Sequence, residues 1–132
     1  MPEINWLAAI VAGLWTFALG GLWYSPVLLG KPWGRAVGFD PASPGGYAPA
    51  ITFGVGLLLA ELASINLAFF LGAKPELTYA VLASASVGLL WTSTSYAIIG
   101  FFERRPASLM LINAGFEVAR FAGMGLILGL WH

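Results

Sequence analysis

Four long apolar runs, separated by polar connections, make up nearly the whole of this 132-residue chain. The runs are Ile4–Tyr24, Pro49–Gly72, Leu77–Phe102 and Ala107–Trp131. An α-helix needs about 20 residues to cross the hydrocarbon of a bilayer, and each run supplies them. Pro49, Pro75 and Pro106 stand near the starts of the last three runs, as expected where a missing backbone N–H has no cost. The pattern predicts an all-α integral membrane four-helix bundle, with residues 1–132 in a single transmembrane domain.

The first connection, Ser25–Ala48, is long enough to hold structure of its own. Lys31 and Arg35 are four residues apart, as are Trp33 and Val37, so a short helix here would be amphipathic. Such a helix is expected to lie along the cytoplasmic interface, with Trp33 in the headgroup region. Its simplest role is that of an anchor. The alternatives are a lid over a cytoplasmic entrance or a lipid-headgroup site built on Lys31 and Arg35.

Composition supports a membrane location. Hydrophobic residues make up 59% of the chain and charged ones only 9%, with a formal net charge of zero. Soluble domains carry roughly 25% charged residues, so this chain could not surround itself with a water-compatible surface. It has no basic patch for nucleic acid, and the absence of Cys removes disulfides, thiolate catalysis and Cys-ligated metals.

Basic residues are unevenly distributed between the two sides of the predicted bundle. The connections after the first and third runs hold Lys31, Arg35, Arg104 and Arg105, whereas the opposite side offers Lys74 and the amino terminus. Because basic connections stay in the cytoplasm, we expect a multi-pass protein of the cell (inner) membrane with both termini outside.

Three ionisable side chains lie deep within the apolar runs. Glu117 lies about 15 Å into its helix at 1.5 Å per residue, and Glu61 lies roughly 18 Å from the same side. Asn113, Glu117 and Arg120 are spaced to share one face of the fourth helix. An isolated charge at this depth costs at least ~3 kcal/mol. We therefore expect Glu61, Glu117 and Arg120 to find one another, with a guanidinium fork able to bridge both carboxylates.

This intramembrane polar cluster has two interpretations. Trp91 and Thr92 of the third run would add hydrogen-bond donors to it. As a buried ion pair, Glu117 and Arg120 would only set the register of the helices, whereas as a functional site the cluster would handle a proton or a substrate. Both interpretations stay open for the pair. Glu61, which has no partner on its own helix, favours function.

Two further patterns concern helix packing. Val11–Thr16 resembles Val87–Thr92, and Glu61 and Glu117 both begin a Glu-x-Ala segment, so the chain is either two duplicated helical hairpins or the similarity is chance. Small residues on the fourth helix form two ridges that allow close approach of another helix. The ridges are Gly115, Ala119 and Gly123, and Gly125 and Gly129. We expect one ridge to pack within the bundle and the other in a homodimer.

Motifs near both ends of the chain resemble a known family. Trp23–Pro26 reads W-Y-S-P, Gly30–Trp33 reads G-K-P-W, and Leu111–Phe116 reads L-I-N-A-G-F. Together they resemble the signatures of a bacterial family of small four-helix integral membrane proteins, catalogued as a conserved domain of unknown function. The resemblance implies a four-span fold and carries over no activity.

The leading functional hypothesis is a non-enzymatic, homo-oligomeric transporter or ion-coupled permeation unit, with a dimer favoured. Glu61 would be its titratable group, framed by Glu117 and Arg120, and its small-molecule or ion ligand is unspecified. The alternative is a structural or accessory membrane protein that binds lipid or partner helices. An enzyme is disfavoured because the only His is the last residue and no Ser has an evident base, and no metal or cofactor is expected.

Overall fold

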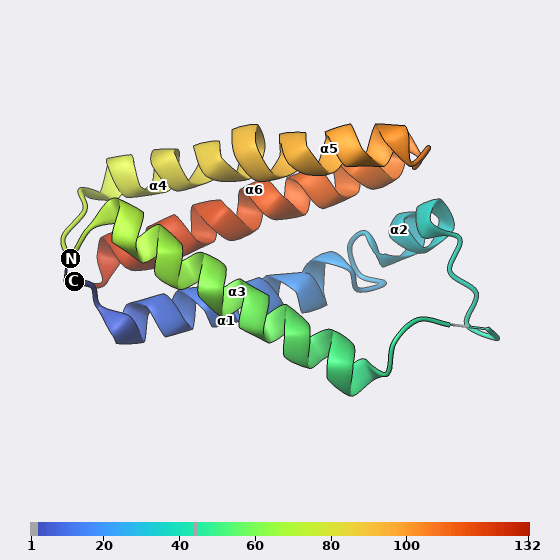
Figure 1. Cartoon of the computed structure of the whole chain (residues 1–132), viewed down its shortest axis with the longest axis horizontal. Coiled ribbons are helices and arrows are strands. Elements are labelled where there is room, and N and C mark those ends of the chain that lie inside the picture. The colour runs from blue at the N-terminus through green and yellow to red at the C-terminus, as the bar shows by residue number, and fades with distance from the viewer. Residues whose placement is uncertain (1–2, 44) are drawn as a thin grey trace.

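The computed structural model describes residues 3–43 and 45–132, so Met1, Pro2 and Pro44 lie outside the described residues. Within them the chain is all-helical (Figure 1). The helices are α1 (Trp6–Trp23), α2 (Gly30–Val37), α3 (Pro49–Leu71), α4 (Leu77–Ser86), η1 (Val87–Thr92), α5 (Ser93–Phe102) and α6 (Ala107–Leu130).

Four helices of the described chain are long and apolar enough to cross a membrane. Three of them are α1, α3 and α6. The fourth consists of α4, η1 and α5, which follow one another without a break. Its middle segment, η1, is a π-helical turn. The predicted all-α class with four membrane-spanning helices is confirmed, and so is the short helix in the first connection.

Local sequence explains where the helices begin and end. The Asn5 side chain caps α1 by accepting a hydrogen bond from a backbone N–H of the first turn (3.0 Å), and Glu76 caps α4 in the same way. Pro49 occupies the first position of α3 and Pro106 the cap position of α6, so both prolines start helices as the sequence predicts. Gly38 ends α2 in the left-handed conformation (φ 78°), where a side chain would be strained.

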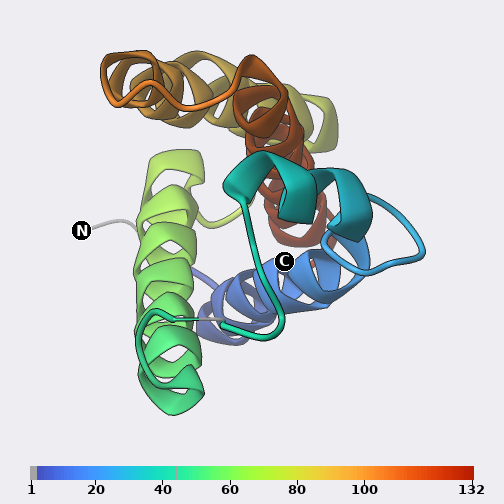
Figure 2. The same ribbon diagram turned by 90° about the vertical axis from the view of Figure 1, so that its right-hand side faces the viewer.

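α6 is the central helix of the bundle. It packs against α1 on one side and against α4, η1 and α5 on the other, while α3 packs mainly on α1 (Figure 2). Both termini and the α3–α4 connection lie at one end, which we call the terminal end (Figure 1). The opposite end, called the basic end, carries α2 and the α5–α6 connection, and with them Lys31, Arg35, Arg104 and Arg105.

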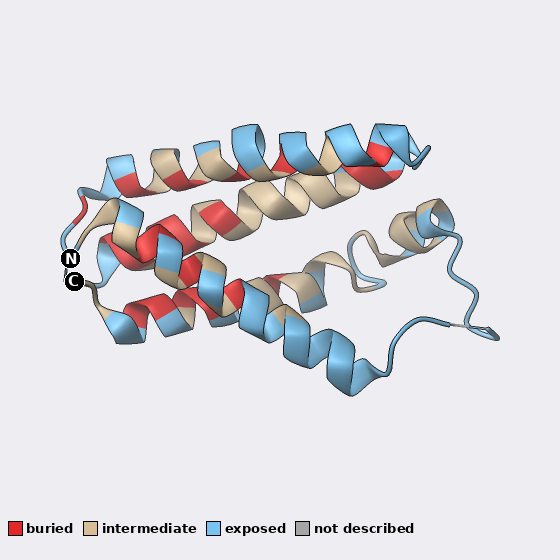
Figure 3. Cartoon of the chain, in the orientation of Figure 1, coloured by how far each residue is buried: buried red, intermediate tan, exposed pale blue. Residues whose placement is uncertain are grey.

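The buried core lies in the terminal half of the bundle. Small and apolar residues of α1, α3 and α6 fill it, namely Ala8, Ala9, Ala12, Leu67, Ala68, Phe121, Met124 and Leu128. In the basic half, the first part of α3 has no close neighbour around most of its circumference, and Ile51–Leu59 are exposed apart from the half-buried Gly56 (Figure 3). The bundle is therefore closed at its terminal end and open at its basic end.

Both small-residue ridges of α6 are used inside the chain. Gly125 and Gly129 lie directly against α4, and Gly115 and Gly123 lie under tryptophans of α1, with the half-buried Ala119 between them. The expectation that one ridge serves a homodimer is wrong, because a surface already packed within the chain cannot also contact a second copy.

The two segments that resemble each other in sequence have different structures. Val11–Thr16 is α-helical, and the half-buried Trp15 indole lies against Gly123 of α6. Val87–Thr92 forms the π-helical turn, and its Trp91 is 60% exposed. The structure adds no support to an internal duplication.

Candidate functional site

A cavity of about 780 Å³ lies in the open half of the bundle, between η1, α5 and α6; we call it the polar cavity. α6 contributes Asn113, Phe116, Glu117 and Arg120, the third span contributes Trp91, Thr92, Ser95 and Tyr96, and the basic end contributes Tyr24 and Trp33. The α6 residues follow the spacing of one helix face, so they extend over roughly 10 Å along the helix. The polar cavity thus runs from Trp33 at the basic end to Arg120, about 20 Å from the start of α6.

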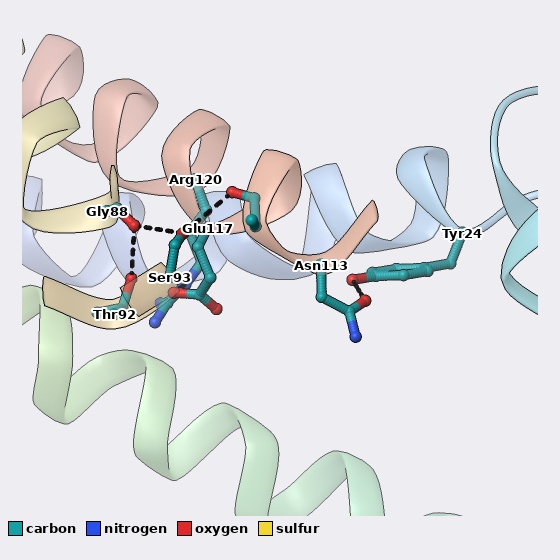
Figure 4. Close-up of polar contacts among 8 residues, drawn as sticks. Tyr24, Gly88, Thr92, Ser93, Asn113, Glu117 and Arg120 are labelled. Carbon is teal, nitrogen blue, oxygen red and sulfur yellow. Dashed lines mark hydrogen bonds and ion pairs between the residues drawn. The ribbon is translucent and has the colours of Figure 1, made fainter. Parts of the chain in front are cut away.

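An ion pair lies at the deep end of the polar cavity. Nε of Arg120 donates to Oε2 of Glu117 at 3.1 Å, and the two side chains are only 14% and 22% exposed. The guanidinium carbon lies 4.4 Å from the centre of the Phe121 ring, which covers one of its faces. Both charged side chains extend from α6 to the same side (Figure 4).

The contact between Arg120 and Glu117 uses only some of their hydrogen-bonding atoms. Within the described residues, neither the Nη atoms of Arg120 nor Oε1 of Glu117 has a hydrogen-bond partner. A guanidinium carries five N–H donors in a planar fork, and only the Nε donor is used here. The polar cavity therefore offers a ligand a free cationic fork and one free carboxylate oxygen.

A hydrogen-bonded chain of side chains lies nearer the basic end. The hydroxyl of Tyr24 donates to Oδ1 of Asn113 (2.6 Å; Figure 4). In turn, Nδ2 of Asn113 donates to the hydroxyl of Tyr96 (2.7 Å). Asn113 thereby ties the end of α1 and α5 to α6. The sequence places Asn113 on the Glu117 face but gives no sign that Tyr24 meets it, because the contact joins residues 89 positions apart.

The π-helical turn η1 shapes the wall of the polar cavity. The Gly88 carbonyl accepts hydrogen bonds from the hydroxyls of Thr92 (2.9 Å) and Ser93 (2.6 Å), and from the backbone N–H of Ser93 (Figure 4). Because Gly88 has no side chain, η1 approaches α6 so closely that an added Cβ would lie 2.6 Å from the carbonyl oxygen of Glu117. Such turns insert one residue into a helix and are frequent at functional sites. Here the turn carries Trp91 and Thr92, which line the cavity.

Glu61 does not join this cluster. Its carboxylate lies over Gly13 of α1, and its Oε2 is buried without a hydrogen-bond partner among the described residues. The expectation that Glu61 meets Glu117 and Arg120 is wrong. Equal depth along the helices does not fix the direction in which a side chain points around its helix. The Glu61 face of α3 is turned toward α1, where the neighbouring turn is held by a hydrogen bond from Ser64 to the carbonyl of Ala9 (2.6 Å).

The structure places the three predicted interfacial residues of α2 in different surroundings. Trp33 lines the polar cavity and packs edge-on against Tyr24, with ring centres 5.5 Å apart. Arg35 borders a separate hollow of about 390 Å³ beside the start of α6, and Lys31 is exposed. Among the described residues, no three His, Asp or Glu side chains lie close enough together to hold a metal ion.

Comparison with known protein families places most of the chain in one family model. The model of a family described as "Protein of unknown function (DUF1761)" matches residues 7–129, which agrees with the resemblance seen in the sequence motifs. No curated protein and no solved structure matches the chain.

Proposed function

We propose a transport function for this chain, which belongs to the DUF1761 family of proteins of unknown function. In this proposal it is a homo-oligomeric transporter of the cell (inner) membrane that binds a small ligand in the polar cavity, at Glu117 and Arg120. One observation carries the proposal. An unsaturated ion pair faces a cavity of about 780 Å³ partway through a membrane-spanning bundle.

The environment of the ion pair favours function over a purely structural role. A structural pair in hydrocarbon is stable when its donors and acceptors are used up, because unpaired polar groups there are costly. The free Nη donors of Arg120 instead face a space large enough for water or a ligand. Ionisable residues that face such a space in membrane proteins mark ligand or ion pathways.

The shape of the bundle is consistent with one state of an alternating-access cycle. The polar cavity ends partway along α6, and beyond it the buried core around Met124 fills the space between α1, α3 and α6. Many transporters hold ligand near the midplane in a site that is open to one side and sealed from the other. This chain would then be open at its basic end.

Orientation and assembly complete the proposal. Because the basic end carries Lys31, Arg35, Arg104 and Arg105, it would face the cytoplasm and both termini would lie outside. A second copy would pack on the side of the first half of α3 that is turned away from the polar cavity, since the glycine ridges of α6 are occupied within the chain. The proposed transport involves no catalytic step and no cofactor.

Side-specific thiol labelling tests the proposal, and the natural absence of Cys makes every introduced thiol unique. Ser95→Cys places a thiol on the wall of the polar cavity. Ile98→Cys is the matched control, because it lies nearer the basic end on the same helix, outside the cavity, and is 60% exposed. A membrane-impermeant maleimide added at the basic face of vesicles should label the Ser95→Cys protein faster than the Ile98→Cys protein.

The opposite order of labelling rates would contradict the proposal. If Ile98→Cys reacts faster, depth alone governs reactivity and no water enters the cavity. Glu117 and Arg120 would then act as an enclosed pair, and the alternative of a structural or accessory protein that binds lipid or partner helices would be favoured. That alternative draws on the fact that the pair lies within one turn of a single helix.

A further inference from the structure

A second cavity continues the path of the polar cavity toward the terminal end. It has a volume of about 500 Å³ and lies between the second half of α3 and the α4–η1 segment. Its lining is mostly apolar, with Asn66, Tyr79, Ser86 and Thr92 as polar exceptions. Trp91 and Thr92 line both cavities, so the two spaces adjoin at the π-helical turn. Together they follow one flank of the third span from the basic end to Tyr79 near the terminal end.

This pair of cavities is open to the side as well as to the end. No residue of α3 lines the polar cavity, and the part of α3 nearest the basic end is exposed around nearly its whole circumference. In a bilayer, the space beside an unclosed bundle is filled by lipid chains. A small hydrophilic ion in such a site would be in contact with hydrocarbon. An amphiphile, by contrast, can keep its apolar chain in the lipid while its polar head enters the protein.

We propose that the two cavities form one lateral groove that carries the phosphate head of a lipid-like amphiphile, with Trp91 as the gate between its halves. This inference rests on the proposed transport function and names its substrate class. The chain of the amphiphile stays in the bilayer, and only its head passes along α6 and the third span. No bond is made or broken.

Charge complementarity selects an anionic head with tetrahedral oxygens. The free Nη edge of Arg120 can bind two oxygens of a phosphate at once, while Glu117 fixes the guanidinium through Nε. Lys31 and Arg35 stand on α2 at the basic end, where lipid phosphates lie. The groove thus has a cationic fork at its deep end and the hydroxyl of Tyr96 nearer the basic end, while Lys31 and Arg35 lie outside its lining, on the same short helix as Trp33.

The position of Trp91 suits a gate. Its indole packs edge-on against Phe70 of α3, with ring centres 6.4 Å apart and planes at 87°, so the two rings meet across the groove. Trp91 is 60% exposed, so its rotation breaks no buried packing. It also stands in the π-helical turn, where a change to α-helical hydrogen bonding would turn the ring relative to Thr92 and Arg120.

Lipid translocation in vesicles tests this inference with the whole chain. The protein is reconstituted into vesicles of phosphatidylethanolamine and phosphatidylglycerol that contain a trace of acyl-labelled fluorescent phosphatidylglycerol, and external dithionite bleaches the outer leaflet. Wild-type vesicles should lose inner-leaflet fluorescence faster than protein-free vesicles. Trp91→Ala should raise this rate several-fold, and Leu90→Ala, which is 59% exposed in the same turn and lines neither cavity, should leave it unchanged.

Variants of the ion pair test the chemistry of the head. Arg120→Lys keeps the charge but loses the fork, so translocation should fall several-fold. Should Arg120→Lys not assemble, the double variant Glu117→Gln with Arg120→Gln removes both charges together and should abolish translocation, because it leaves no fork for the phosphate. Retention of the wild-type rate in the double variant would overturn the role assigned to the pair.

Two controls separate failure of this inference from failure of the transport proposal. If Ser95→Cys is labelled as proposed but no lipid moves above the protein-free rate, the groove hypothesis is wrong and transport through the cavity survives. If glycerol phosphate, a water-soluble phosphate ester, enters the vesicles while the labelled lipid does not, the phosphate chemistry holds and the amphiphile is refuted. If Ser95→Cys is not labelled, both proposals fail.

Discussion

The contact between η1 and α6 gives a sharp prediction for Gly88→Ala. A Cβ at this position would lie 2.6 Å from the carbonyl oxygen of Glu117 and 2.9 Å from the Cα of Val118, whereas ordinary van der Waals contact begins at 3.4 Å. Both neighbouring atoms belong to the backbone, so no side-chain rotation relieves the clash. η1 and α6 would have to separate, and α6 is also held by α1 on its other side.

Two opposing effects set the magnitude of this change. Ala is favoured over Gly within a helix by roughly 0.5–1 kcal/mol. Overpacking a tight interface costs about 1–3 kcal/mol. We therefore expect Gly88→Ala to lower the free energy of unfolding by about 1–2 kcal/mol. Gly54→Ala is the matched control, because nothing lies within 4 Å of its added Cβ, and only the favourable effect remains.

Thermal unfolding in a mild detergent, followed by tryptophan fluorescence, compares the two alanine variants with the wild type. Since about 1 kcal/mol corresponds to roughly 4 °C in Tm, Gly88→Ala should melt several degrees below the wild type and Gly54→Ala slightly above it. A Gly88→Ala protein as stable as Gly54→Ala would mean that η1 does not touch α6. The wall that carries Trp91 would then be misplaced, and the cavity with it.

Three further predictions follow from individual contacts. Ser64→Ala removes a fully buried 2.6 Å hydrogen bond to α1 and should lower stability by about 1 kcal/mol, which chemical denaturation in detergent measures; no change would mean that α3 is not docked as described. Glu61→Gln should leave stability unchanged or raised, because Oε2 has no partner to lose, and a clear fall in Tm would reveal one. Hydrogen bonds from two backbone N–H groups at the start of α4 lower the pKa of Glu76. The ionised Glu76 cap therefore stabilises the fold fully at pH values above the ordinary carboxyl pKa, and this stabilisation is lost as the pH falls through the lowered pKa of Glu76. Glu76→Gln should therefore flatten the dependence of Tm on pH in that acidic range, and an unchanged pH profile would exclude the cap.

Hydropathy and turn chemistry are enough to predict the long helices of this chain, though not how they pack. The first and third runs agree with their helices to within a few residues, and Pro49 begins α3 where its missing N–H costs nothing. The short helix α2 follows from the spacing of Lys31 and Arg35. The π-helical turn could not be predicted, because it depends on Gly88 meeting the backbone of α6, a contact with no local signal.

The candidate site could be predicted only in part, for a geometric reason. Asn113, Glu117 and Arg120 belong to one helix, so their spacing alone fixes a common face, and the structure has all three along one cavity. Glu61 belongs to another helix, and its depth says nothing about which way that helix is turned. Its direction is set by packing on α1, where Gly13 leaves room for the carboxylate. The spacing of residues along the sequence does not predict which helix faces contact one another.

In the proposed transport function, a water-accessible groove passes Thr92 in the interior of the membrane. Thr92 and Thr94 form a matched pair, since the hydroxyl of each donates to the carbonyl four residues earlier. Only Thr92 lines the two cavities, whereas Thr94 is exposed and borders a separate, apolar hollow. Nitroxide labels at Thr92→Cys and Thr94→Cys in vesicles report contact with a water-soluble nickel complex and with oxygen, which prefers the lipid. We expect strong nickel contact at position 92 and oxygen contact alone at position 94. Equal and weak nickel contact at both positions would contradict the proposal.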